Sequence, residues 1–199
     1  MSDSPNGILP VRFERWFEGL LQPAVRSFSR WGITPNTLTL ASLVFALAAG
    51  ILLAFSLPLW ALIPVIIMGL CDILDGQVAR HNHTASQFGA ILDSSLDRYT
   101  EFLILAGLGV HYFAAGEPWW ILVTALALVG SFEISYIKAR AEGAGQRCPV
   151  GLLQRSERLV LLGLALLLGG WALKAVLALM AVMAHYTALQ RLLYLRKIS

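Results

Sequence analysis

Apolar residues in this chain are gathered into long runs, and most charged residues lie between the runs. A helix needs about 20 predominantly apolar residues to cross a membrane, because it rises 1.5 Å per residue and the hydrocarbon layer is about 30 Å thick. Six segments approach this length: residues 37–56, 57–80, 89–113, 119–142, 157–170 and 171–195. The pattern therefore predicts six transmembrane helices, and it places the boundary between the last two at Gly169, Gly170 and Trp171.

A different pattern precedes the first run. From residue 9 to residue 31, apolar side chains such as Trp16 and Leu20 alternate with charged ones such as Arg15 and Arg26. An amphipathic helix of this kind lies in the plane of the membrane interface and does not cross it. The sequence thus predicts an all-α integral membrane protein, with an interfacial amphipathic segment in residues 1–36 and a six-helix transmembrane domain in residues 37–199.

The composition excludes a water-soluble globular domain. Apolar residues make up 57% of the chain and charged residues only 14%, whereas soluble domains carry about 25% charged residues. The net charge is +3, but the basic residues form no continuous stripe, so we expect no nucleic-acid partner.

The basic residues also orient the predicted bundle, because loops rich in Lys and Arg stay in the cytoplasm during insertion. All but one of them fall on the side of the amino terminus or at the matching helix ends, and the exception is Lys174. We therefore expect a multi-pass protein of the cell membrane with both termini on the cytoplasmic side.

Four acidic residues interrupt the apolar background at Asp72, Asp75, Asp93 and Asp97. Because a carboxylate at bilayer depth costs at least a few kcal/mol, acids in such positions indicate function. Asp72 and Asp75 are three residues apart and Asp93 and Asp97 are four apart, so each pair lies on one face of its helix. The polar link of residues 81–88 between the two helices is short, and the spacing predicts that the acidic faces meet near the cytoplasmic side, where the active site would lie.

Four carboxylates in one pocket require cations, because like charges at close range disfavour ionisation. A ligand set made only of oxygen atoms favours Mg²⁺ or Mn²⁺, and this many acids favours two ions per site. Gly76 and Ala79 lie on the same face as Asp72 and leave space for a bulky group, while Arg80 at the rim can hold a phosphate. Two other interpretations are fixed pairing between helices and a cation or proton pathway, as in a transporter.

These residues follow the pattern D-x2-D-G-x2-A-R-x8-G-x3-D-x3-D, which begins at Asp72 and ends at Asp97. Gly89 is the glycine four residues before Asp93. The sequence therefore resembles the CDP-alcohol phosphatidyltransferase family, whose six-span core also matches the predicted helices. The resemblance implies an enzyme that transfers the phosphatidyl group of a CDP-linked lipid to an alcohol and releases CMP. It implies two metal ions held by Asp72, Asp75, Asp93 and Asp97, with Asp97 also acting as the general base, and a homodimer.

The resemblance further implies residues that bind the two substrates. Those expected to contact the CDP-linked lipid, which is CDP-diacylglycerol or CDP-archaeol, are Asn36, Thr37, Thr39, Gly76, Ala79, Arg80 and Ser86. The basic residues near the site favour an anionic acceptor, and those that match phosphate-binding positions in phosphatidylinositol-phosphate synthases are Ser135, Lys138, Arg158 and Arg191. We therefore expect the acceptor to be a phosphorylated polyol, L-myo-inositol 1-phosphate. The alternatives are a phosphatidylglycerophosphate synthase that uses glycerol 3-phosphate and, in another class, a cation transporter.

Overall fold

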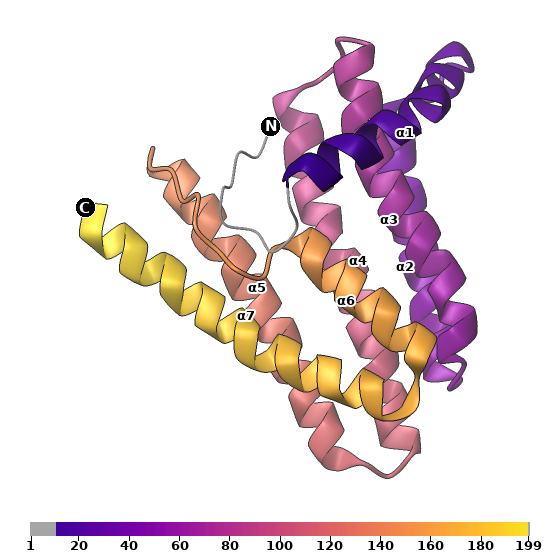
Figure 1. The fold of residues 1–199 in the computed structure, drawn as a ribbon, viewed down its shortest axis with the longest axis vertical. Helices are drawn as coiled ribbons and strands as arrows, with labels where there is room; N and C mark the ends of the chain where they lie inside the picture. Colours follow the sequence, from indigo (N-terminus) through magenta and orange to yellow (C-terminus); the bar gives the residue numbers. More distant parts are fainter. Residues whose placement is uncertain (1–10, 199) are drawn as a thin grey trace. The chain divides into compact units, whose positions relative to one another are not determined.

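The structure is a computed structural model that describes residues 11–198, with side chains from Phe17 onward, and all its elements are helices. In chain order these helices are α1 (Val11–Arg30), α2 (Pro35–Ala54), α3 (Pro58–His81), α4 (Gln87–Ala114), α5 (Pro118–Gly143), α6 (Arg155–Leu168) and α7 (Gly170–Ile198) (Figure 1). Each predicted segment is helical. The part of the amphipathic segment that precedes Val11 lies outside the described residues.

Local sequence signals explain where the helices begin and end. Pro35, Pro58 and Pro118 each stand at the start of a helix, where the missing N–H and the fixed φ of proline fit the first turn. The Thr34 side chain caps α2 by accepting a hydrogen bond of 3.3 Å from the backbone N–H of Thr37. Gly169, with a φ of +64°, separates α6 from α7, which confirms the predicted boundary.

Four of the described helices are long and apolar enough to cross a membrane: α2, α3, α5 and α7. The 28 residues of α4 would span about 42 Å, but the first half of this helix carries several charged residues. The 14 residues of α6 rise only about 21 Å, which is less than the hydrocarbon thickness. The finding is therefore an all-helical protein with four candidate membrane spans.

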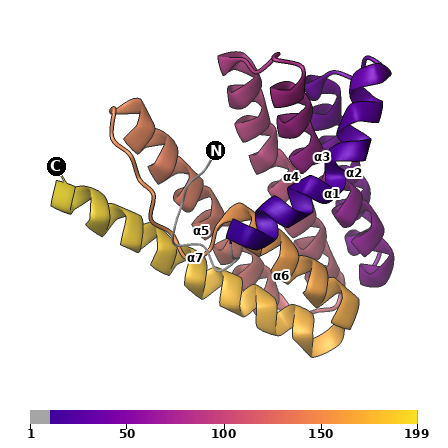
Figure 2. The ribbon, with the colours of Figure 1, turned by 45° about the horizontal axis from the view of Figure 1, so that its top comes forward.

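The chain forms two compact units. The N-terminal unit comprises Arg12–His111, and the C-terminal unit contains the chain from Tyr112 onward. In the N-terminal unit α2, α3 and α4 run side by side, and α1 crosses them at an angle (Figure 2). Val25 of α1 is fully buried and packs with Leu38, Leu74 and Val78, so apolar contacts fix α1 onto α2 and α3.

Glycines bring α2 and α4 together in the N-terminal unit. A Cβ atom added to Gly107 would lie 2.2 Å from the carbonyl oxygen of Gly50, and one added to Gly50 would lie 2.4 Å from the carbonyl oxygen of Leu103. Real Cβ contacts are not this short, so the two backbones touch only because both residues lack side chains. This crossing is the closest helix contact among the glycines of the N-terminal unit.

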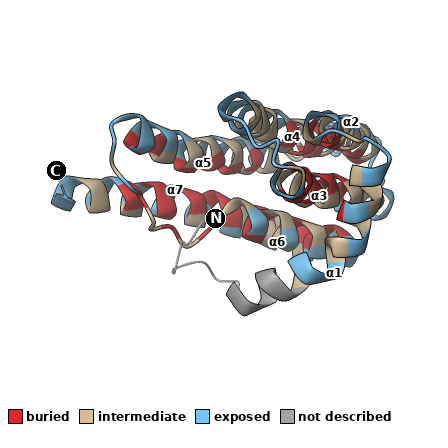
Figure 3. Cartoon of the chain, turned by 90° about the horizontal axis from the view of Figure 1, so that it is seen from above, coloured by how far each residue is buried: buried red, intermediate tan, exposed pale blue. Residues whose placement is uncertain are grey.

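In the C-terminal unit, α5 packs along α7, and α6 contacts α7. Figure 3 shows buried positions along α5 and α7, and the cluster of Ala127, Met180 and Ala181 is part of their interface. At the end of the unit near the α6–α7 turn, Lys174 Nζ lies 2.6 Å from Glu117 Oε2. The same ammonium lies 5.4 Å and 5.3 Å from the ring centroids of Trp120 and Trp171, which is cation–π distance.

Candidate active site

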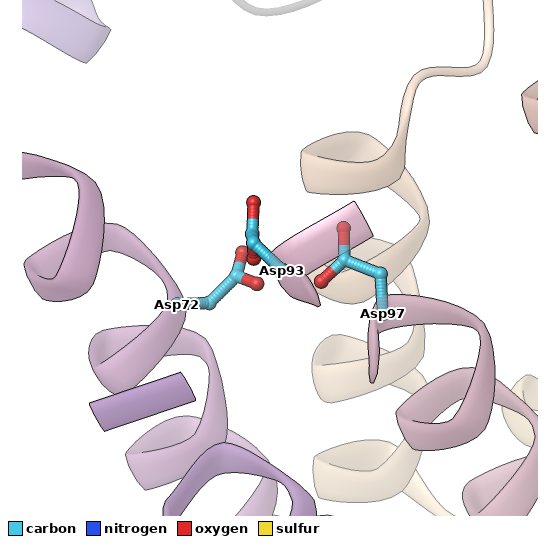
Figure 4. Close-up of side chains that lie close together, drawn as sticks. All are labelled: Asp72, Asp93 and Asp97. Atoms are coloured by element: carbon cyan, nitrogen blue, oxygen red, sulfur yellow. The ribbon is translucent and has the colours of Figure 1, made fainter. Parts of the chain in front are cut away.

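Three carboxylates from two helices converge in the N-terminal unit. Asp72 comes from α3, and Asp93 and Asp97 come from successive turns of α4. One oxygen of each carboxylate lies within 4.8 Å of the other two, and all three residues are partly buried. Figure 4 shows the three side chains pointing toward one another. The prediction that the acidic faces of these two helices meet is confirmed for these residues.

Asp75, the fourth acid, is held differently. It is buried, and its Oδ2 accepts a hydrogen bond of 2.7 Å from the hydroxyl of Thr39 on α2. It does not belong to the three-carboxylate group, although its charge is near enough to interact with those of Asp72 and Asp93. The Thr39–Asp75 bond ties α2 to α3 beside the cluster, so the acidic centre draws on three helices.

The donor set of this centre fits a divalent metal ion. Carboxylate oxygens are hard ligands, and Mg²⁺ and Mn²⁺ prefer such ligands. Three converging carboxylates without a cation would repel one another in partly buried surroundings. These residues therefore fit the Mg²⁺ or Mn²⁺ ion that the sequence predicts. Asp72, Asp93 and Asp97 lie close enough together to bind one such ion.

A cavity of about 450 Å³ lies beside the acidic centre in the same unit. Its lining includes six of the seven residues predicted to bind the CDP-linked lipid, namely Asn36, Thr39, Gly76, Ala79, Arg80 and Ser86, together with Asp75 and Asp93. Thr37 is not part of the lining, and its hydroxyl lies 2.8 Å from that of Thr34, at the start of α2. The cavity has the size of a pocket for a small organic ligand.

The amino-terminal end of α4 faces this cavity. Ser86 precedes the helix, and its Oγ accepts a hydrogen bond of 3.0 Å from the backbone N–H of Gly89. A Cβ atom on Gly89 would lie 3.1 Å from Ser86 Oγ and 3.9 Å from Asn36 Oδ1, so these polar groups are neighbours. Because the start of a helix presents N–H groups and a positive dipole end, this part of the cavity favours an anion such as a phosphate.

Sequence reasoning missed other residues of the lining. The α3–α4 link contributes Asn82, Thr84 and Ala85, and the turn before α2 contributes Gly32 and Ile33. The polar composition of the link was a signal that these residues are accessible. Nothing in their spacing indicated that the turn before α2 reaches the same cavity.

The predicted acceptor-binding residues all belong to the C-terminal unit. Ser135 and Lys138 lie one turn apart on α5, and Lys138 Nζ is 4.0 Å from Glu142 Oε1. Arg158 on α6 and Arg191 on α7 are only 2% and 5% exposed. The charge of Arg191 is near enough to interact with that of Arg158, and also with the opposite charge of Glu142.

Both arginines also hold the loop that precedes α6. Arg158 donates a hydrogen bond of 3.2 Å to the carbonyl oxygen of Leu153, and Arg191 Nε donates one of 2.9 Å to the carbonyl oxygen of Val150. Arg191 Nη1 donates to the carbonyl oxygen of Ile134 on α5. The sequence did not indicate this second role, which depends on where the loop crosses α7.

Comparison with known proteins gives one consistent result. Residues 32–190 match the CDP-alcohol phosphatidyltransferase family. The chain is 34% identical over 188 residues to the phosphatidylinositol phosphate synthase of Mycobacteroides abscessus, covering 88% of this chain and 83% of the relative. It is 33% identical over 173 residues to the archaetidylinositol phosphate synthase of Pyrococcus horikoshii, covering 86% of this chain and 88% of that protein.

The fold is also similar to a solved structure. The crystal structure of Mycobacterium tuberculosis phosphatidylinositol phosphate synthase with CDP-DAG bound superimposes with a TM-score of 0.78 at 31% identity, covering 85% of this chain and 90% of that one. The same enzyme in complex with manganese and citrate gives the same TM-score and identity, with 85% of this chain and 86% of that chain covered.

Proposed function

From its membership of the CDP-alcohol phosphatidyltransferase family, to which this chain belongs, we propose that it transfers the phosphatidyl or archaetidyl group of a CDP-linked lipid to L-myo-inositol 1-phosphate and releases CMP. The observation that carries the proposal is the convergence of Asp72, Asp93 and Asp97 beside a cavity. Six of the residues predicted to bind the CDP-linked lipid line this cavity. The names of the relatives, which are phosphatidylinositol phosphate and archaetidylinositol phosphate synthases, support the acceptor.

The acidic centre is the proposed site of the chemistry. Asp72, Asp75, Asp93 and Asp97 would hold two Mg²⁺ or Mn²⁺ ions, and a bound metal supplies Lewis-acid polarisation of the diphosphate oxygens. The crystal structure of the M. tuberculosis enzyme with manganese supports this choice of metal. Asp75 keeps its orientation through the hydroxyl of Thr39.

Asp97 is the proposed general base. Its side chain is 15% exposed, and Arg98 Nη1 lies 3.8 Å from its Oδ2. Asp97 takes the proton of the acceptor hydroxyl as that oxygen bonds to the lipid-side phosphorus. The bond between this phosphorus and the bridging oxygen breaks, and CMP leaves with the electron pair.

The cavity is the proposed binding site for the CDP moiety. Arg80 and the start of α4 stabilise the negative charge of the diphosphate, because each presents N–H donors to an anion. Gly76 and Ala79 have small or no side chains and let the ligand approach the backbone of α3. Asn36, Thr39 and Ser86 supply further polar groups to the lining of the cavity, and Thr37 at the start of α2 is proposed to contact the ligand as well.

The acceptor phosphate is proposed to bind Ser135, Lys138, Arg158 and Arg191. Arginine suits a phosphate because its planar guanidinium can donate two parallel hydrogen bonds. Lys138 is 38% exposed and supplies a positive charge within the last two turns of α5. The burial of Arg158 and Arg191 supports a site that excludes water from the phosphate.

We also propose the membrane arrangement that the sequence predicts. Residues 1–36 form the interfacial segment, and residues 37–199 form a six-helix transmembrane domain with α4 and the short α6 as the two further spans. Both termini and the active site face the cytoplasm, and the enzyme is a homodimer.

The test is an assay of CMP release by the purified protein. CDP-diacylglycerol is supplied with inositol 1-phosphate, glycerol 3-phosphate, serine or inositol, with Mg²⁺ or Mn²⁺ present or chelated. We expect release only with metal and inositol 1-phosphate. Preference for glycerol 3-phosphate would overturn the acceptor, and cation flux in vesicles without CMP release would indicate a transporter.

Two variants test the catalytic assignment. Asp97→Asn should lower CMP release by at least about 100-fold, since a general base contributes about 10²–10⁴-fold. Glu133→Gln is the matched control, because Glu133 is an exposed acid on α5, and it should keep its activity. Near-normal turnover of Asp97→Asn in a folded protein would contradict the role of Asp97.

A further inference from the structure

Helix α1 contacts the end of α3 through polar side chains as well as apolar ones. The three pairs that form this polar seam are Glu18 with Arg80, Gln22 with Gln77, and Ser29 with Asn82. The Arg80 Nη2 atom lies 3.4 Å from Glu18 Oε1, and Gln22 Nε2 donates a hydrogen bond of 3.1 Å to Gln77 Oε1. An amphipathic segment that only rested on the membrane surface would not need these contacts.

The spacing along α1 shows that the seam is one face of the helix. Glu18, Gln22, Val25 and Ser29 are separated by four, three and four residues, so their side chains share a face. Val25 is fully buried at the centre of this face. The apolar contact therefore fixes the rotation of α1, and it holds the polar side chains against the last turns of α3.

Two of the three residues that α1 contacts in the polar seam also line the cavity. Arg80 and Asn82 both line it, and Arg80 also covers Gly76, because a Cβ atom on Gly76 would lie 3.4 Å from Arg80 Nη1. One guanidinium group thus has Nη2 beside Glu18 and Nη1 over the cavity wall. The carboxylate of Glu18 restricts the directions in which the Arg80 side chain can point.

We propose that Glu18 is a positioning residue that holds Arg80 at the rim of the cavity, so that α1 is part of the binding site for the CDP-linked lipid. This inference rests on the proposed function, in which Arg80 binds the diphosphate. Glu18 itself does not touch the ligand. It acts by keeping the guanidinium near its bound orientation, which lowers the entropy lost when the diphosphate binds.

The size of the effect follows from the exposure of the pair. The Arg80 and Glu18 side chains are 55% and 49% exposed. Ion pairs between exposed side chains change an equilibrium constant by up to about fivefold. We therefore expect Glu18→Gln to raise the KM for CDP-diacylglycerol by about two- to fivefold, while the KM for inositol phosphate stays the same and the thermal unfolding temperature falls by no more than about 4 °C.

The experiment measures both KM values and kcat for the full-length enzyme and its variants in one detergent. Glu18→Asp should restore part of the affinity for CDP-diacylglycerol, because it keeps the charge. In an Arg80→Gln background, Glu18→Gln should have no further effect, because the partner is gone. Arg26→Gln changes another exposed charge on α1 and serves as the matched control with unchanged KM values.

The outcomes separate this proposal from the proposed function. Absence of CMP release by the wild-type protein would overturn both. An active wild type whose KM for CDP-diacylglycerol is unaffected by Glu18→Gln would overturn the positioning role alone. A rise in both KM values together with a fall of more than about 4 °C in the unfolding temperature would show a purely structural contact and would overturn it as well.

Discussion

Replacing Gly107 by alanine tests the close crossing of α2 and α4. The new Cβ atom would lie 2.2 Å from the carbonyl oxygen of Gly50 and 2.7 Å from its Cα atom. Favourable contacts between non-bonded heavy atoms begin at about 3.5 Å, so the two helices would have to separate by about 1 Å. Inserting one carbon into a packed contact of this kind costs about 1–3 kcal/mol.

The same displacement would reach the acidic centre. Helix α2 carries Thr39, which bonds to Asp75, and α4 carries Asp93 and Asp97. Gly107 is about 15 Å along α4 from Asp97, and a helix that shifts at one point moves along much of its length. Because a misplacement of about 1 Å can lower a rate by about 100-fold, we expect Gly107→Ala to lower CMP release as well as stability.

The assay is thermal unfolding in detergent, followed by CMP release below the transition. For a chain of this size, 1–3 kcal/mol corresponds to a decrease in Tm of about 2–12 °C. Gly109→Ala is the matched control, because no atom lies within 4 Å of its Cβ position and alanine favours the helix by up to about 1 kcal/mol. If Gly107→Ala unfolds at the temperature of Gly109→Ala and keeps full activity, the steric argument is wrong.

Two further predictions concern the C-terminal unit. Gly151→Ala should raise the KM for inositol phosphate several-fold and change the KM for CDP-diacylglycerol less, because the new Cβ atom would lie 2.9 Å from Arg191 Nη2 at a residue with a φ of +148°. Steady-state kinetics with each substrate varied in turn measure the two KM values. Equal changes in both values would contradict the prediction. Lys174→Met should lower stability by about 1–2 kcal/mol, because it removes the cation between two tryptophans and leaves Glu117 without its partner. Its Tm should fall while both KM values stay the same, and Lys174→Arg should keep most of the stability.

The sequence predicts the helices well because most of them coincide with long apolar runs, and several of these runs begin or end at a residue with a strong local preference. Proline stands at the start of α2, α3 and α5, and Gly169 interrupts the last apolar stretch. Such preferences depend on a few neighbouring residues and need no knowledge of the fold. The number of membrane spans is a different matter, because α6 has only 14 residues and its position depends on the helices that it contacts.

The acidic centre could be predicted for a similar reason. Intervals of three and four residues place side chains on one face of a helix, and a short link brings the two faces together. The bond between Thr39 and Asp75 could not be predicted, because it depends on how α2 crosses α3. The polar seam between α1 and α3 was missed because the same charged pattern is expected for a helix that lies on a membrane.

The two halves of α4 differ in composition and in the contacts that they make. Its first half carries Asp93 and Asp97 and presents its amino-terminal end to the cavity, so it cannot be as apolar as an ordinary span. Its second half contains Gly107, where the backbone touches α2. The tight crossing fixes the second half of α4 against α2. A substitution far from the acids is therefore expected to change catalysis, and the charged residues in the first half of α4 explain why this helix is not among the four candidate membrane spans.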